Sequence, residues 1–176
     1  MFSNEDFATW MIDESIGSAV ILGGALVDEE LLLLLLRALP STDKEDGLFD
    51  PERPLGAFSA RIKLAHRLSL IDDDFAKGLN VLRDIRNDVA HGFKLISLNS
   101  NSLRDRIANL SRWVSTNDHY PTALEALREH RPNSDPLHRH FAICIVGIVM
   151  RLRNARASIE PLRANVCLSI AARKGK

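Results

Sequence analysis

The apolar positions of this chain recur mostly at spacings of three and four residues, which is typical of helices buried along one face. The clearest stretch is 14–39, whose inward positions are Ile16, Val20, Val27, Leu31 and Leu34. Pro40 ends this helix, and the polar segment 41–56 with its prolines and glycines predicts a loop. Because the chain contains no alternating strand pattern, hairpin signal or internal repeat, the sequence predicts an all-α fold.

The same spacing, together with helix-end signals, predicts about six or seven helices in all. The second covers about 57–70, the third begins after Asp72 and ends at His91 before Gly92, and the fourth begins at 101 or 102. A short helical turn is expected at 122–129, a strong helix from Asp135 and Pro136 to about 156, and a basic helix over 161–173. The expected inward residues are Phe58, Ile62, Ala65, Leu68, Phe75, Leu79, Leu82, Ile85, Val89, Leu103, Ile107, Leu110, Val114, Phe141, Ile145, Ile148 and Leu152.

A chain of 176 residues is long enough to bury a core without a disulfide or a metal, so we predict a single helical domain over 1–176. Within it we expect an irregular connection at 117–136 and C-terminal helices at 137–173. The cysteines Cys144 and Cys167 show neither CxxC nor Cys/His spacing, which argues against a zinc site. Acidic residues near the first methionine and the lack of a long apolar run favour a cytoplasmic location.

The formal net charge of zero hides an uneven distribution of charge along the chain. Residues 1–50 hold 2 basic and 11 acidic residues, residues 51–150 hold 14 and 11, and residues 151–176 hold 7 and 1, so the net charges are −9, +3 and +6. The basic tail could mark a nucleic-acid binder, but we favour a solvated helix face that compensates the acidic first half.

The segment LRDIRNDVAHG, at 82–92, carries the residues best suited to chemistry. Arg86, Asn87 and His91 form an R-N-x-x-x-H pattern near the predicted end of a helix. Arg86 and His91 would point about 140° apart on an ideal helix, whereas Asn87 and His91 can touch. Arginine would supply a permanent positive charge for a phosphate, and histidine would move a proton near neutral pH.

This pattern resembles the R-x4-6-H motif of HEPN domains, which are all-helical bundles. In such domains arginine and histidine from two subunits can form a metal-independent ribonuclease site, so the resemblance implies that Arg86, Asn87 and His91 could act across a dimer. The alternative is structural: Arg86 and Asn87 anchor the following loop, and His91 caps its own helix. We favour the structural interpretation, because one motif per chain makes catalysis depend on a subunit geometry that nothing in the sequence guarantees.

Two longer blocks of the sequence carry motifs of their own. The first has the pattern P-L-G-x-F-S-x-R/K-I-K-L, with matches at Pro54, Leu55, Gly56, Phe58, Ser59, Ile62, Lys63 and Leu64. The second has the pattern I-R-N-x-x-A-H, with matches at Ile85, Arg86, Asn87, Ala90 and His91. Together the two blocks resemble the signature of the mannitol operon repressor family. With the upstream helix the family-like core covers 14–110. Arg61 and Lys63 could line a groove with Arg86, whereas Phe58 and Ile62 are expected in the core.

The resemblance implies a small all-helical bacterial regulator, named for repression of mannitol uptake and use, without a recognisable DNA-reading module. The residues agree, since no helix-turn-helix with a basic recognition helix is evident and a net charge of zero is poor for binding phosphates. We therefore expect a transcriptional regulator that acts through a protein partner, needs no cofactor or metal, and binds DNA directly only weakly or not at all.

Three further features of the sequence lead to expectations. Gly17, Gly23 and Gly24 in the first long helix suggest the close approach of another backbone, and with the leucine run 31–36 they favour a homo-oligomer. His138 and His140 point about 200° apart, which makes a poor metal site and favours surface roles. Trp10 and Trp113 are expected to be packing anchors rather than base-stacking platforms.

Overall fold

The computed structural model describes residues 4–40, 47–91 and 101–163, and over these ranges the chain folds as a single all-α domain of seven helices without strands. The helices are α1 (Asn4–Asp13), α2 (Ile16–Ala38), α3 (Phe58–Arg67), α4 (Asp73–His91), α5 (Asn101–Val114), α6 (Tyr120–His130) and α7 (Pro136–Ser158). The all-α fold class expected from the pattern is therefore confirmed.

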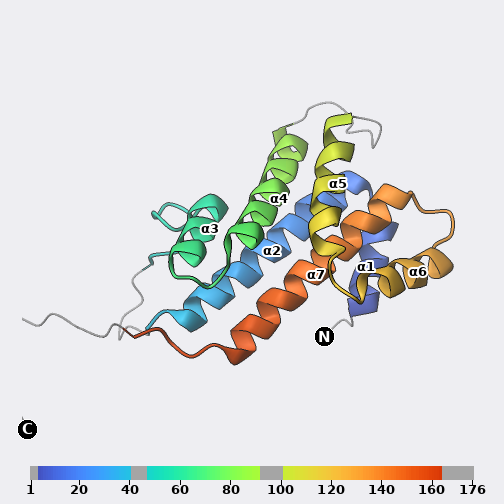
Figure 1. Cartoon of the computed structure of the whole chain (residues 1–176). Coiled ribbons are helices and arrows are strands. Elements are labelled where there is room, and N and C mark those ends of the chain that lie inside the picture. The colour runs from blue at the N-terminus through green and yellow to red at the C-terminus, as the bar shows by residue number, and fades with distance from the viewer. Residues whose placement is uncertain (1–3, 41–46, 92–100, 164–176) are drawn as a thin grey trace, which may run out of the picture.

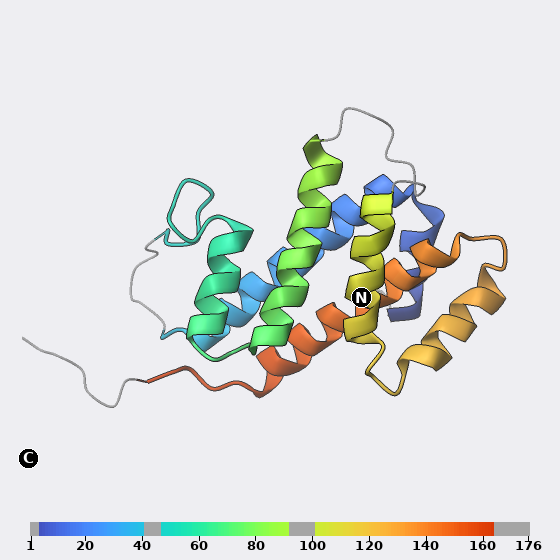
Figure 2. The same cartoon turned by 45° about the horizontal axis from the view of Figure 1, so that its top comes forward.

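The two longest helices, α2 and α7, pack side by side at the centre of the bundle and run in the same direction (Figure 1). The carboxyl-terminal ends of the two helices are joined, because Leu162 N–H, just beyond α7, donates to the carbonyl of Ala38, the last residue of α2, at 2.7 Å. Helices α3, α4 and α5 stand in a row over this pair, while α1 and α6 lie at the opposite end from α3 (Figure 2). The arrangement leaves α2 covered by α3 and α4 over part of its length.

Buried ionic contacts also join α2 to α7. Glu30 on α2 is only 4% exposed, and its carboxylate lies 2.6 Å from Arg153 Nε and 3.1 Å from Arg156 Nη1, both on α7. The acidic first half of the chain thus meets the basic end of α7 in the folded state, as the uneven charge distribution suggests.

Most helices bury the positions that their spacing predicts. The residues Leu103, Ile107, Leu110 and Val114 of α5 are all buried, as are Leu79, Leu82 and Ile85 of α4. Two of the predicted helix starts are capped as expected: Asp72 Oδ1 accepts from Phe75 N–H at 2.8 Å, and Asp135 Oδ1 accepts from Leu137 N–H at 2.7 Å. Asn101 and Ser102, which were expected to cap the next helix, lie inside α5 instead. The local signals for the two capped helix starts therefore survive in the tertiary structure.

Several helix bounds differ from the sequence prediction, and α1 was not predicted at all. Helix α3 ends at Arg67 rather than near 70, because Ser69 adopts a left-handed conformation (φ 57°) and Leu70 N–H turns back to the Ala65 carbonyl. Helix α6 is longer than the expected turn at 122–129. The helix expected over 161–173 does not begin at its first residues, since 161–163 have no regular structure, and 164–173 lie outside the described residues.

The surface roles expected for the two histidines of α7 are wrong. His138 is 6% exposed and His140 is half-buried, because both lie in the first turns of α7, where α1 and α6 cover it. None of the helices in the described ranges combines the length and the apolar character that crossing a bilayer requires.

Candidate functional site

The two family-like blocks meet on α2. The first block forms the end of the loop 47–57 and helix α3, and the second forms the last two turns of α4. Because α3 and α4 pack against each other and both lie on α2, one arginine from each block reaches the same carboxylate, that of Asp28. We call Asp28, Arg61 and Arg86 the Asp28 junction.

Arg61 is the more buried cation of the junction, with only 9% of its surface exposed. Its Nη1 donates to Asp28 Oδ1 at 2.9 Å, its Nε donates to the Leu55 carbonyl at 3.0 Å, and its Nη2 donates to the Phe49 carbonyl at 3.1 Å. One guanidinium thereby fixes the loop before α3 to the middle of α2. The planar group with donors on all three nitrogens suits this task better than a lysine would.

The loop that Arg61 holds is folded tightly on itself. Three successive turns connect it, from Asp50 N–H to the Gly47 carbonyl, from Arg53 N–H to that of Asp50, and from Gly56 N–H to that of Arg53. A methyl group at Gly56 would lie 2.2 Å from the Asp50 carbonyl oxygen, so no larger residue fits there. The glycine of the first block is therefore explained by close packing within the loop.

Arg86 approaches Asp28 across the surface of Gly24. A methyl group at Gly24 would lie 2.9 Å from Arg86 Cδ, so this glycine makes room for the arginine side chain. Arg86 Nη1 lies 3.9 Å from Asp28 Oδ2, an ion pair without hydrogen-bond contact, and the side chain keeps 33% of its surface exposed. The glycines that suggested backbone approach thus face side chains instead.

Burial dominates the electrostatics of Asp28. Removal from water raises the pKa of its carboxyl above the usual value, although Arg61 and Arg86 both act to lower it. The ionised carboxylate is therefore costly here, and it is compensated by residues of the same chain. This arrangement suits a structural cross-link between helices rather than a group that exchanges protons with a substrate.

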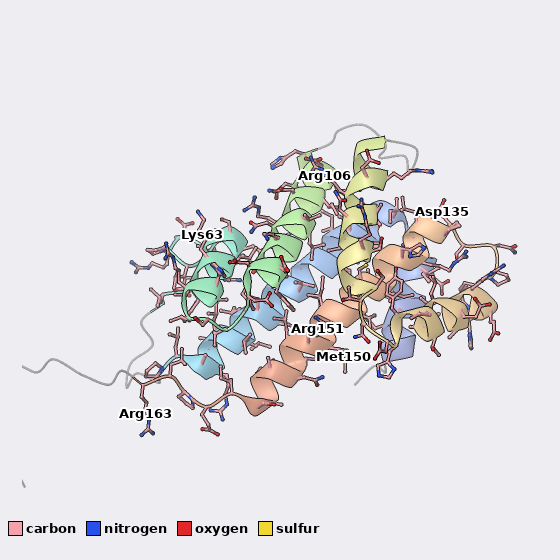
Figure 3. All side chains as sticks on the ribbon, viewed as in Figure 1. Lys63, Arg106, Asp135, Met150, Arg151 and Arg163 are labelled. Atoms are coloured by element: carbon pink, nitrogen blue, oxygen red, sulfur yellow. The ribbon has the colours of Figure 1, made fainter. Side chains whose placement is uncertain are left out.

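The other candidate residues do not join the junction. Asn87 and His91 are exposed on the last turns of α4, and among the described residues no hydrogen bond or ion pair joins Arg86 to His91. Pro54 and Lys63 are exposed, with Lys63 on the outer side of α3 (Figure 3), Ser59 is half-buried, and Phe58 belongs to the core. The expected groove is thus replaced by a closed contact between Arg61, Arg86 and Asp28.

Sequence reasoning missed Asp28. The available signal was Asp28 itself, because the preceding part of α2, residues 16–27, is almost wholly apolar. An acid on the buried side of a helix needs a partner, which could have pointed to an arginine elsewhere in the chain.

A second polar cluster lies between α5, α6 and α7. The Tyr120 hydroxyl is hydrogen-bonded to His140 Nδ1, and Cys144 lies one turn further along α7. Burial raises the pKa of Tyr120 and of the Cys144 thiol and lowers the pKa of His140. All three groups are thus kept uncharged, and a buried neutral thiol is a poor nucleophile. Over the described part of the chain, no group of three His, Cys, Asp or Glu side chains is placed to hold a metal ion.

The fold and the junction define the class of this protein as a single-domain helical bundle cross-linked through the half-buried carboxylate of Asp28. Comparison of the chain with known protein families, with curated proteins and with solved structures found no match. The resemblance to the mannitol operon repressor family accordingly stays a prediction from the two blocks.

Proposed function

We propose that the protein is a non-enzymatic transcriptional regulator that works through protein contacts, as its resemblance to the mannitol operon repressor family implies. The observation that supports this best is the convergence of Arg61 and Arg86, one from each block, on Asp28. A guanidinium engaged with a carboxylate of its own chain is less available to a phosphate. The residues of the two blocks then stabilise the fold. The regulator acts in the cytoplasm as a homo-oligomer and contacts its protein partner through an exposed surface.

The second candidate function is a HEPN-type ribonuclease that uses Arg86, Asn87 and His91 across a dimer. The observation in its favour is that Asn87 and His91 are both exposed one turn apart on α4. Arg86 is also held only loosely, since 3.9 Å separates its Nη1 from the nearest oxygen of Asp28. A second copy docked at this end of α4 would bring two such sets together.

An RNA cleavage assay separates the two functions. A labelled single-stranded RNA is incubated with the purified protein in excess chelator, alongside Arg86→Ala, His91→Ala and, as a control outside the motif, His119→Ala. We expect no cleavage by the parent protein. Arg86→Ala should lower the free energy of unfolding by about 1 to 2 kcal/mol, whereas exposed His91→Ala should change it by less than about 0.5 kcal/mol. Metal-independent cleavage that a folded His91→Ala protein loses by about 100-fold would establish the ribonuclease instead.

A test in cells addresses regulation directly. Transcripts are measured in source cells that lack the gene and in the same cells complemented with the parent, with His91→Ala or with a destabilised Arg61→Met protein. Deletion should change a small set of transcripts, with sugar-alcohol uptake genes the first to examine. His91→Ala should restore them as well as the parent does, and Arg61→Met should restore them less. Unchanged transcripts after deletion would refute the regulator.

A further inference from the structure

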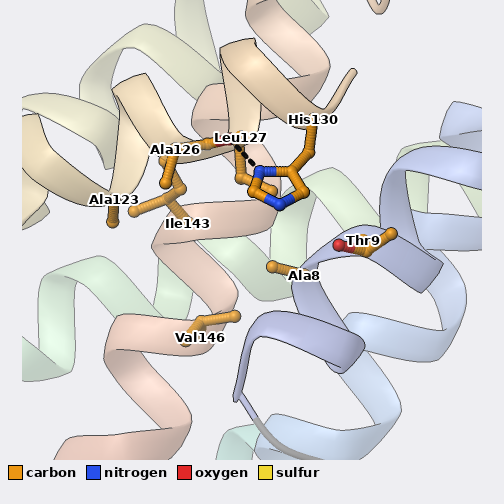
Figure 4. A pocket seen from close by; sticks show the side chains of 8 residues that line it. All are labelled: Ala8, Thr9, Ala123, Ala126, Leu127, His130, Ile143 and Val146. Atoms are coloured by element: carbon orange, nitrogen blue, oxygen red, sulfur yellow. Dashed lines mark hydrogen bonds between the residues drawn. The ribbon is translucent and has the colours of Figure 1, made fainter.

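A mostly apolar cavity of about 180 Å³ lies between α1, α6 and α7 (Figure 4). Its lining consists of Ala8, Thr9, Ala123, Ala126, Leu127, His130, Ile143 and Val146. Three of these are alanines, which are too small to fill the space between α1 and α6. A cavity of roughly 150 Å³ is large enough to hold benzene, so this one suits a single small ring.

Contacts at both ends of α6 hold the cavity open. Tyr120, at the start of α6, is hydrogen-bonded to His140 of α7. Arg131, just after α6, makes a two-pronged ion pair with Asp13 at the end of α1, with Nε–Oδ1 and Nη2–Oδ2 distances of 2.7 and 2.8 Å. The space is therefore present before any ligand arrives, which lowers the cost of binding.

The polar groups of the lining restrict the chemistry of the ligand. None of the lining residues is an acid, a lysine or an arginine, so a charged ligand would enter without a counter-charge. His130 Nδ1 lies 2.8 Å from the Ala126 carbonyl oxygen, and because a carbonyl oxygen only accepts, Nδ1 must carry the hydrogen. In the neutral ring Nε2 is then an acceptor, and it points into the space between α6 and α1 (Figure 4).

We propose that this cavity is a binding site for a small uncharged aromatic alcohol, whose ring fills the apolar space and whose hydroxyl donates to His130 Nε2. Because Ala123 and His130 are exposed, the ligand can enter along α6. Occupation would bridge α1 and α6 and stabilise their packing on α7. This binding is independent of the regulatory function proposed above.

Phenol is the probe, and toluene is the matched compound without a hydroxyl. Binding to the full-length protein is measured from ligand NMR line broadening and from the rise in Tm. Phenol should bind with a Kd of about 1 mM or below and more tightly than toluene. His130→Ala should weaken the binding of phenol about fivefold, which corresponds to the loss of one neutral hydrogen bond. The affinity for toluene should stay unchanged.

Variants that fill the cavity with a larger side chain test whether phenol and toluene bind there. Ala126→Leu should weaken the binding of both compounds more than about tenfold. Ala25→Leu, at an exposed position of α2, should leave both affinities unchanged. Ala123→Leu is a second filling variant, and circular dichroism checks that each variant is folded. The proposal is wrong if phenol fails to bind at about 10 mM, if the folded filling variants bind it like the parent, or if His130→Ala affects phenol and toluene equally.

Discussion

At the scale of single residues, Arg61 and Asp28 contribute unequally to their shared contact. Arg61 donates to two backbone carbonyls besides Asp28, whereas burial already raises the pKa of Asp28 and makes its charge costly. An asparagine at position 28 would keep an oxygen that accepts from Arg61 without carrying that charge. Removal of the cation and removal of the charge on the anion should therefore have different effects.

We predict that Arg61→Met lowers the free energy of unfolding by about 3 kcal/mol, because it leaves the half-buried carboxylate of Asp28 and two carbonyls without their donor. Asp28→Asn should lower it by about 1 kcal/mol or less. Arg67→Met, at an exposed position of the same helix, serves as the control and should be nearly neutral. Urea denaturation at pH 7 measures all three, and equal losses for Arg61→Met and Asp28→Asn would contradict the argument.

At the scale of secondary-structure elements, α2 carries glycines that differ in what surrounds them. The atoms nearest to a methyl group at Gly17 would be 3.9 Å away, which is ordinary contact. At Gly23 the methyl group would lie 3.0 Å from Met11 Cε and 3.2 Å from Ile145 Cγ1, both in the core. At Gly24 it would meet Arg86, so only the second and third glycines are required by their neighbours.

We predict that Gly17→Ala raises the free energy of unfolding by about 0.5 kcal/mol through helix propensity, while Gly23→Ala lowers it by about 1 to 2 kcal/mol through overpacking. Gly24→Ala should also be destabilising in the parent protein, because it displaces Arg86 from Asp28. The same change should become stabilising in an Arg86→Ala background, where the obstacle is gone. A cycle of the two single variants and the double variant, measured by urea denaturation, checks this coupling, and additive effects would show that Gly24 and Arg86 are independent.

At the scale of the whole molecule, part of α2 has no helix over it. Leu22 is 41% exposed and Leu36 is 53% exposed, and residues 14 positions apart on a helix lie only about 40° apart around its axis. The buried members of the leucine run are Leu31, Leu34 and Leu35, so the run serves the core on one side and faces solvent on the other. Large exposed leucines on one face favour contact with another molecule.

We predict that the protein is a dimer at about 50 μM and that Leu22→Glu together with Leu36→Glu makes it a monomer. The two introduced carboxylates would be buried in an apolar contact without a counter-charge, which is costly. Leu48→Glu, which changes an exposed leucine in the loop before α3, should leave the dimer intact. Light scattering coupled to size-exclusion chromatography measures the mass. A monomeric parent protein would remove self-association through α2.

The amino-acid pattern by itself determined the helical class and most of the bundle. Periodic apolar positions located α2, α4, α5 and α7. Apolar residues at spacings of three and four lie on one face only in a helix, and that face is stable when it packs against a core. Asp72 and Asp135 marked helix starts, because a cap acts on the nearest backbone N–H groups and needs no distant partner. The short helix α1 and the left-handed Ser69 escaped prediction, since neither carries a strong local signal.

Only the tertiary structure decided which polar residues meet. The separation between Asp28, Arg61 and Arg86 along the chain is set by two connecting segments and by their positions within three helices, α2, α3 and α4, and no local rule relates them. Burial of His138 and His140, pairing of Glu30 with α7, and the cavity beneath α6 likewise follow from how the helices pack on one another. Local sequence specifies helices because their hydrogen bonds are local, whereas a site formed between helices depends on contacts among distant residues.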